Sequence, residues 1–148
     1  MEDSLPREET TSAGSIVVPA YNEAHRIGPL LEVLRSSVSV LHARVIIVCN
    51  GCDDATADIA RRVGGVEVAE LATASKTGAL NEGDRLAGDL FPRLYVDADA
   101  ITDVDSIARL FASLESESPI AVRPSSRPER PAVRRNYWRP SSPNGCHR

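Results

Sequence analysis

Two hydrophobic patterns alternate along most of the chain. Short apolar runs, rich in β-branched residues, lie at 15–19, 44–49, 66–71 and 93–96, which is typical of buried strands. Between the first two runs, apolar residues spaced by threes and fours predict a helix with one apolar face. These residues are Ile27, Leu30, Leu31, Leu34, Val38 and Leu41. The run at 66–71 alternates between apolar and polar residues, so we expect it nearer the edge of a sheet.

Helical spacing recurs after each later run. Helices are predicted at 54–63, with Asp54 as the N-cap, at about 78–90 and at about 107–114. The apolar stretch "PIAVR" at 119–123 predicts a fifth strand. This alternation of strands and helices predicts an α/β fold, with a mostly parallel sheet covered by helices on both faces.

Composition changes towards both ends of the chain. Residues 1–14 are polar and predict a disordered leader, and residues 15–122 predict one α/β domain. Residues 123–148 contain five Pro and seven Arg without apolar periodicity. This last segment predicts a disordered tail or a truncated continuation of the domain.

The net charge of -4 conceals an acidic body. Residues 1–122 carry 10 Lys and Arg against 20 Asp and Glu, a net charge of -10. Because binding to phosphate backbones needs cations, this argues against nucleic acid as a partner. No apolar run approaches the ~20 residues of a membrane helix. With three Cys and no apolar core for a secretory signal, we expect a cytoplasmic protein without a transmembrane segment.

Polar residues follow every predicted strand. The four exits read "PAYNEAHR", "NGCDDAT", "ATASKTGALN" and "DADAITD". In parallel α/β sheets these exits meet at the edge where ligands bind. The last exit holds Asp97 and Asp99, which suit a divalent cation, Mg²⁺ or Mn²⁺, shared with substrate phosphates. The alternative is that both acids only form turns or cap a helix.

The other exits have two interpretations each. Tyr21 can stack on a base and Glu23 can accept from ribose hydroxyls, or this exit is only a turn. Lys76 and Asn81, at a helix start, can face an anion such as a diphosphate, or the lysine is simply solvated. Cys49 and Cys52 form a C-x-x-C that fits a redox dithiol.

Two further interpretations concern the cysteines. A Zn²⁺ site would require Cys146 and His147 as additional ligands. The plainer interpretation is a turn at Gly51, with Cys49 as a small buried apolar residue.

Taken in order, the four segments resemble the family 2 glycosyltransferases, which have the Rossmann-like GT-A nucleotide-diphospho-sugar transferase fold. "SIVVPAYNEAHRIGPLLEVL", "VIIVCNGCDDATADIARR", "ASKTGALNEG" and "LYVDADAIT" carry this resemblance. It implies a UDP-, GDP- or dTDP-sugar donor, with Tyr21 against the base. It also implies that Asp99, together with Asp97, coordinates the metal at the diphosphate. The residues implied to bind the substrate are Pro19, Ala20, Tyr21, Glu23, Asn50, Lys76, Asn81 and Asp97.

This sequence departs from the family pattern in two places. Cys49 and Asn50 stand where the family has an acidic pair, although Asn50 can still hydrogen-bond a base edge. Compared with the family pattern, we expect the C-terminal half of the fold to be missing, and no acid follows Glu129 to serve as the general base. We therefore expect a fragment, or a half-domain completed by another chain, that binds the donor weakly and transfers little sugar to its unknown acceptor.

Two other functions fit parts of the pattern. A vestigial module that binds nucleotide sugars without catalysis needs no acceptor half. A phosphatase of the haloacid dehalogenase type also places D-x-D after an apolar strand, with Asp97 as the nucleophile. That class needs a later Lys, and none follows Lys76.

Overall fold

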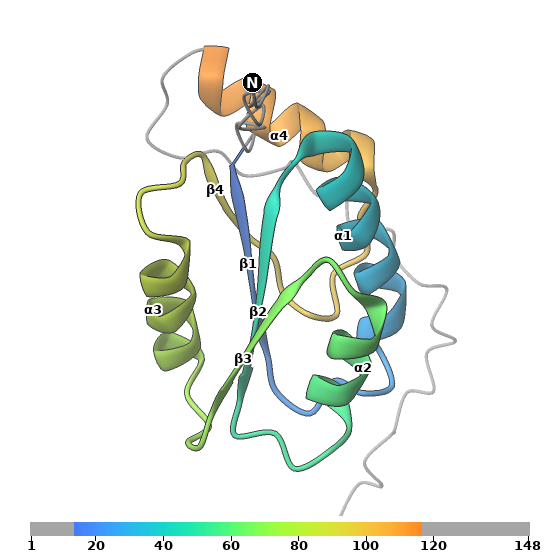
Figure 1. Ribbon diagram of the computed structural model, residues 1–148, viewed down its shortest axis with the longest axis vertical. Coiled ribbons are helices and arrows are strands. Elements are labelled where there is room, and N and C mark those ends of the chain that lie inside the picture. The colour runs from blue at the N-terminus through green and yellow to red at the C-terminus, as the bar shows by residue number, and fades with distance from the viewer. Residues whose placement is uncertain (1–13, 117–148) are drawn as a thin grey trace, which may run out of the picture.

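The computed structural model describes residues 14–116. Its strands are β1 (Ser15–Ala20), β2 (Arg44–Asn50), β3 (Glu67–Leu71) and β4 (Arg93–Tyr95). They pair in the order β3-β2-β1-β4, and every pairing is parallel (Figure 1). The predicted parallel sheet is confirmed, and the alternating strand β3 lies at an edge of the sheet that the described residues form.

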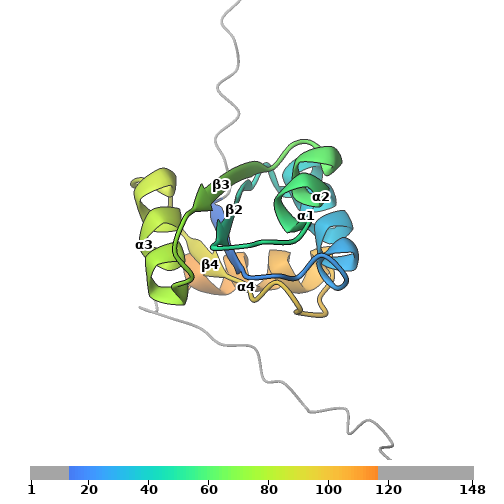
Figure 2. The same cartoon turned by 90° about the horizontal axis from the view of Figure 1, so that it is seen from below.

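Helices cover both faces of this sheet, as predicted. They are α1 (Ile27–Leu41), α2 (Thr56–Val63), α3 (Lys76–Ala87) and α4 (Val104–Ser116). Helix α3 packs on one face, whereas α1, α2 and α4 lie on the other (Figures 1 and 2). The carboxyl ends of the strands all point towards the bottom of Figure 1.

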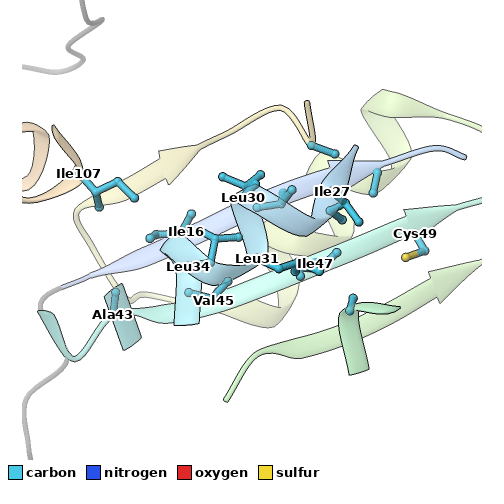
Figure 3. Close-up of a cluster of buried hydrophobic side chains, with 14 of the residues drawn as sticks. Ile16, Ile27, Leu30, Leu31, Leu34, Ala43, Val45, Ile47, Cys49 and Ile107 are labelled. Atoms are coloured by element: carbon cyan, nitrogen blue, oxygen red, sulfur yellow. The ribbon is translucent and has the colours of Figure 1, made fainter. Parts of the chain in front are cut away.

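Alternate residues of the central strands supply the two layers of the core. Ile16 and Ile47 face α1 and belong to the larger buried cluster, in which Leu30 and Leu34 of the helix lie over the strands (Figure 3). Their neighbours, such as Ile46, face α3. Burial of one such side chain contributes about 1.5–3 kcal/mol, so the two central strands stabilise the platform on which the strand exits rest.

The fourth strand differs from its prediction. It ends at Tyr95 rather than Val96, and it is only partly buried, with Tyr95 49% exposed. It pairs with β1 alone among the described residues, and the amide of Val96 makes a last hydrogen bond to Val17 O at 3.0 Å. A strand that pairs with a neighbour along one edge only is more exposed to solvent than β1, which pairs along both edges.

Three helix starts also differ. The helix predicted at about 107–114 begins at Val104 as α4. Helix α3 begins at Lys76, earlier than predicted, because the hydroxyl of Ser75 accepts from Gly78 N at 3.0 Å and caps it. It ends at Ala87 rather than near residue 90. In α2 the N-cap position is held by Ala55, not Asp54, although the Asp54 carboxylate still accepts from the amide of Thr56 at 2.9 Å.

Several predictions lie outside the described residues. These are the disordered leader, apart from Gly14, the fifth strand at 119–123 and the tail at 123–148. Within residues 14–116, every helix is too short or too polar to cross a lipid bilayer.

Gly83 of α3 permits the close contact between this helix and β1. A Cβ there would overlap Cγ1 of Val17, which is fully buried and β-branched and so cannot rotate away. We expect Gly83→Ala to lower the free energy of unfolding by about 1–3 kcal/mol, although Ala favours helix. Gly28→Ala, in the open first turn of α1, is the matched control and should leave it unchanged or raise it. Equal urea midpoints for the two variants would contradict this packing.

Candidate functional site

The exits of β1, β2 and β4 and the start of α3 enclose a depression at the carboxyl edge of the sheet. We call it the strand-end hollow, and its volume is about 320 Å³. It is lined by Pro19, Tyr21, Glu23, Asn50, Lys76, Asp97, Ala98 and Asp99. The structure therefore brings together most of the residues that the sequence singled out. Ala20 and Asn81 are not among its lining residues.

A second depression adjoins the first. This helix-side hollow, with a volume of about 530 Å³, lies between α3 and β4. It shares Pro19, Lys76 and Asp97 with the strand-end hollow and has Asn81 in its wall. Asn81 thus lines the hollow that adjoins the predicted site.

Asn50 ties three exits together. Its side-chain amide donates to Ala20 O at 2.8 Å, and its Oδ1 accepts from Ser75 N at 3.1 Å. Because Asn50 is only 5% exposed, both bonds are shielded from water. The sequence suggested Asn50 as a base-binding residue. The structure gives it a second role, which fixes Ala20 and the N-cap of α3 in place.

The turn after β2 requires a glycine. Gly51 has φ of 66°, and a Cβ on it would come within 2.5 Å of Ala74 N. Its own amide donates to Leu71 O at 2.8 Å, where β3 ends. The exits of β2 and β3 are therefore in direct contact, as the predicted turn at Gly51 allows.

The loop after β1 is fastened to the loop after β2. The hydroxyl of Thr56 accepts from Glu23 N at 2.9 Å and donates to the carboxylate of Asp54. The same carboxylate accepts from Ala24 N at 3.1 Å. Burial alone would raise the pKa of Asp54, but the hydrogen bonds from Thr56 and Ala24 outweigh it and lower the pKa below its ordinary value.

Asn22 adds a further fastening between these loops. It adopts a left-handed conformation with φ of 51°, which Asn tolerates, and its Oδ1 accepts from Asp53 N at 3.0 Å. Sequence reasoning did not assign this role to Asn22 or to Thr56, because it depends on which loop lies opposite. Together these bonds hold the loop that carries Tyr21 and Glu23 against the mouth of the hollow.

A lysine offsets the charge of the paired aspartates. Nζ of Lys76 lies 2.6 Å from Oδ1 of Asp97, and both side chains are largely exposed. The turn in the alternative interpretation is present, since the amide of Ala100 donates to the backbone oxygen of Asp97 at 2.9 Å. Helix capping belongs to a later acid, Asp103, which accepts from Ser106 N at 2.7 Å before α4. That hydrogen bond lowers the pKa of Asp103.

The hollow offers carboxylate oxygens to a cation, but few of them. Asp97 and Asp99 both line it. Within residues 14–116, no three His, Cys, Asp or Glu side chains gather closely enough to hold a metal ion by themselves. The pair fits Mg²⁺ or Mn²⁺, which commonly bind through one or two carboxylates plus substrate phosphates.

A polar cluster that the sequence did not predict forms part of the wall of the helix-side hollow. The carboxylate of Asp84 accepts from Arg93 Nη1 at 2.8 Å and from the Tyr95 hydroxyl at 2.6 Å. Burial, followed by the bond to Asp84, raises the pKa of Tyr95. Because the Arg93 side chain is only 7% exposed, this ion pair holds α3 against β4 beside the helix-side hollow.

The two described cysteines are both free thiols. Burial, and then the neighbouring Cys52, raise the pKa of Cys49 to about 12. Such a thiol stays protonated at neutral pH and lacks the thiolate of a redox dithiol. The plainer interpretation, a small buried apolar residue, agrees with this environment. The zinc interpretation needs Cys146 and His147, which lie outside the described residues.

A third depression lies at the opposite end of the sheet. Its volume is about 460 Å³, and its charged residues Arg44 and Glu67 already pair with each other at 2.7 Å. It contains none of the predicted site residues. Ligands of parallel α/β sheets bind at the carboxyl ends of the strands, so we assign the candidate site to the strand-end hollow.

Comparisons with known proteins show what the chain is similar to. The model of the family described as glycosyl transferase family 2 matches residues 15–146. A stretch of 60 residues is 47% identical to the succinoglycan biosynthesis protein ExoA of Rhizobium meliloti (strain 1021), covering 40% of this chain and 18% of that protein. The chain thus spans under a fifth of that relative.

Two solved structures share the fold. Residues 1–349 of S. aureus TarS superpose with a TM-score of 0.56 at 23% identity, covering 68% of this chain and 32% of that one. The same fragment in complex with UDP gives a TM-score of 0.54 at 23% identity, covering 68% and 31%. The expected Rossmann-like GT-A architecture is confirmed.

The Asn50 bridge generates a stability test. We expect Asn50→Ala to lower the free energy of unfolding by about 1–3 kcal/mol, because it leaves Ala20 O and Ser75 N without their buried partner. Asn81→Ala changes an exposed asparagine on α3 and is the matched control, which should stay near wild type. Denaturant titration followed by circular dichroism measures both. A wild-type midpoint for Asn50→Ala would refute the bridge.

Proposed function

The chain belongs to glycosyl transferase family 2, and from this premise we propose that its strand-end hollow binds a nucleotide-diphospho-sugar through a divalent cation. The observation that carries the proposal is the meeting of Lys76, Asp97 and Asp99 in one hollow with Tyr21 and Glu23. Cations and anions from separate exits then face the charged part of a single ligand.

The diphosphate would lie at the α3 side of the hollow. Asp99 and Asp97 would share Mg²⁺ or Mn²⁺ with its oxygens, and Lys76 would face the remaining negative charge. The amino end of α3 adds a favourable dipole for an anion at this point. When bound, the cation would stabilise the charge that develops on the departing diphosphate.

The nucleoside would lie towards the exits of β1 and β2. Tyr21 is 53% exposed although it follows a fully buried strand, which leaves its ring free to stack on a base. The carboxylate of Glu23 can accept from ribose hydroxyls, and the hydrogen bond from its amide to Thr56 fixes its backbone beside the hollow. Asn50 uses one amide hydrogen for Ala20 and keeps another for a base edge. The UDP complex of TarS supports testing uridine first.

The transfer step needs groups that we do not assign within residues 14–116. The absence of a general base, the unknown acceptor and a completing chain stay predictions, as do the cytoplasmic location and weak or absent transfer by the 148-residue chain alone. Sugar turnover by the purified chain would contradict the last of these. The family match favours this proposal over the phosphatase interpretation of the same two aspartates.

Calorimetry tests donor binding. UDP-, GDP- and dTDP-sugars are titrated into the chain with and without Mn²⁺, and we expect binding that Mn²⁺ strengthens at least about tenfold. Asp99→Ala should abolish this strengthening, because it removes a metal ligand.

Asp89→Ala is the matched control, since this exposed acid after α3 lies outside the lining of both hollows. It should bind like wild type. Binding that ignores both Mn²⁺ and Asp99→Ala would refute the assignment of the metal site.

A further inference from the structure

A lysine pairs with one of the two carboxylates proposed to hold the metal ion. Nζ of Lys76 lies 2.6 Å from Oδ1 of Asp97, one of the two carboxylates that would hold the cation. An ammonium group at this oxygen repels a divalent ion that binds the same carboxylate, because both charges are positive. Bare metal must therefore displace Lys76 or bind beside it.

The described site gives bare metal little to compensate for that repulsion. Residues 14–116 provide no third carboxylate, imidazole or thiolate close enough to complete a ligand set. Asp99 can contribute oxygens, but Mg²⁺ and Mn²⁺ ordinarily need phosphates or several waters as well. Without nucleotide, we expect the lysine to hold Asp97 and the metal to bind weakly.

A diphosphate changes both sides of this competition. It brings oxygen ligands to the metal and a new anionic partner to Lys76. The lysine can move, because its side chain is 65% exposed on a long stem, while its backbone is fixed in the first turn of α3 by the Ser75 cap. An exposed ion pair of this kind is weak, so the exchange costs little.

We propose that Lys76 is an exchangeable counter-cation that couples metal binding to nucleotide binding. It neutralises Asp97 in the empty cleft and passes to the diphosphate when the metal and nucleotide bind. Each ligand then raises the affinity of the other by the same factor. The proposal rests on the proposed donor site. It adds that metal and nucleotide bind to this site cooperatively.

The test measures Mn²⁺ binding without nucleotide. Electron paramagnetic resonance counts free Mn²⁺ during a titration of the 148-residue chain and its variants. Lys76→Met removes the charge but keeps the stem, and we expect bare Mn²⁺ to bind about three- to tenfold more tightly. Asp97→Asn in the Lys76→Met background should abolish this gain, which places it at the hollow.

A second titration adds UDP, GDP or dTDP. In Lys76→Met the nucleotide should strengthen Mn²⁺ binding several-fold less than in wild type, because the diphosphate no longer takes a competing cation away. Lys76→Arg keeps the charge and should preserve the coupling. Arg85→Met, which breaks the exposed pair with Glu82 on the same helix, is the matched control and should change neither titration.

The outcomes separate this proposal from the function on which it rests. Bare Mn²⁺ that binds Lys76→Met no more tightly than wild type overturns the counter-cation, and so does a gain that survives Asp97→Asn. A lysine that only contacts phosphate would weaken nucleotide binding without tightening bare metal. If no nucleotide binds wild type with Mn²⁺, the proposed function fails, whatever the bare-metal titration shows. Lys76→Gln replaces Lys76→Met if circular dichroism finds the latter unfolded.

Discussion

Parallel alignment of the strands is the constraint on which the rest of this structure depends. It brings all four strand exits to one edge, where backbone groups lose their ladder partners and charged side chains crowd together. Asn50 satisfies the carbonyl of Ala20, and Gly51 satisfies that of Leu71. Lys76 offsets the charge of Asp97. The groups that close this edge are therefore the ones that shape the hollow.

Hydrophobic periodicity was sufficient to predict the sheet and the residues at its exits. Strands β1 and β2 are buried on both faces, so their apolar runs are unmistakable, and parallel pairing then brings the exits together. The length and burial of β4 were overestimated, because the burial of this strand depends on its neighbours in space rather than on local sequence. The hydrogen bonds from Glu23 and Ala24 to Thr56 and Asp54 were missed for a related reason, since they join loops that lie far apart in the chain.

Most of the acidic side chains around the site have structural partners. Asp54 and Asp84 are both engaged by neighbouring donors, and Asp103 caps α4, so each has a structural role. Asp97 and Asp99 differ, since one holds an exposed lysine and both face the hollow. Acids with local partners stabilise loops, whereas acids left facing a cleft are available to a ligand. This division connects the packing of the exits to the donor site proposed for this member of glycosyl transferase family 2.

If metal and nucleotide bind together at the carboxyl edge of the sheet, bound Mn²⁺ should broaden the backbone amide resonances near that edge, since paramagnetic broadening is strongest close to the ion. With UDP present, we expect selective broadening around Asp97–Asp99 and Lys76, and little at Arg44 and Glu67 at the opposite end. Broadening centred on Arg44 and Glu67, or none that depends on nucleotide, would contradict it.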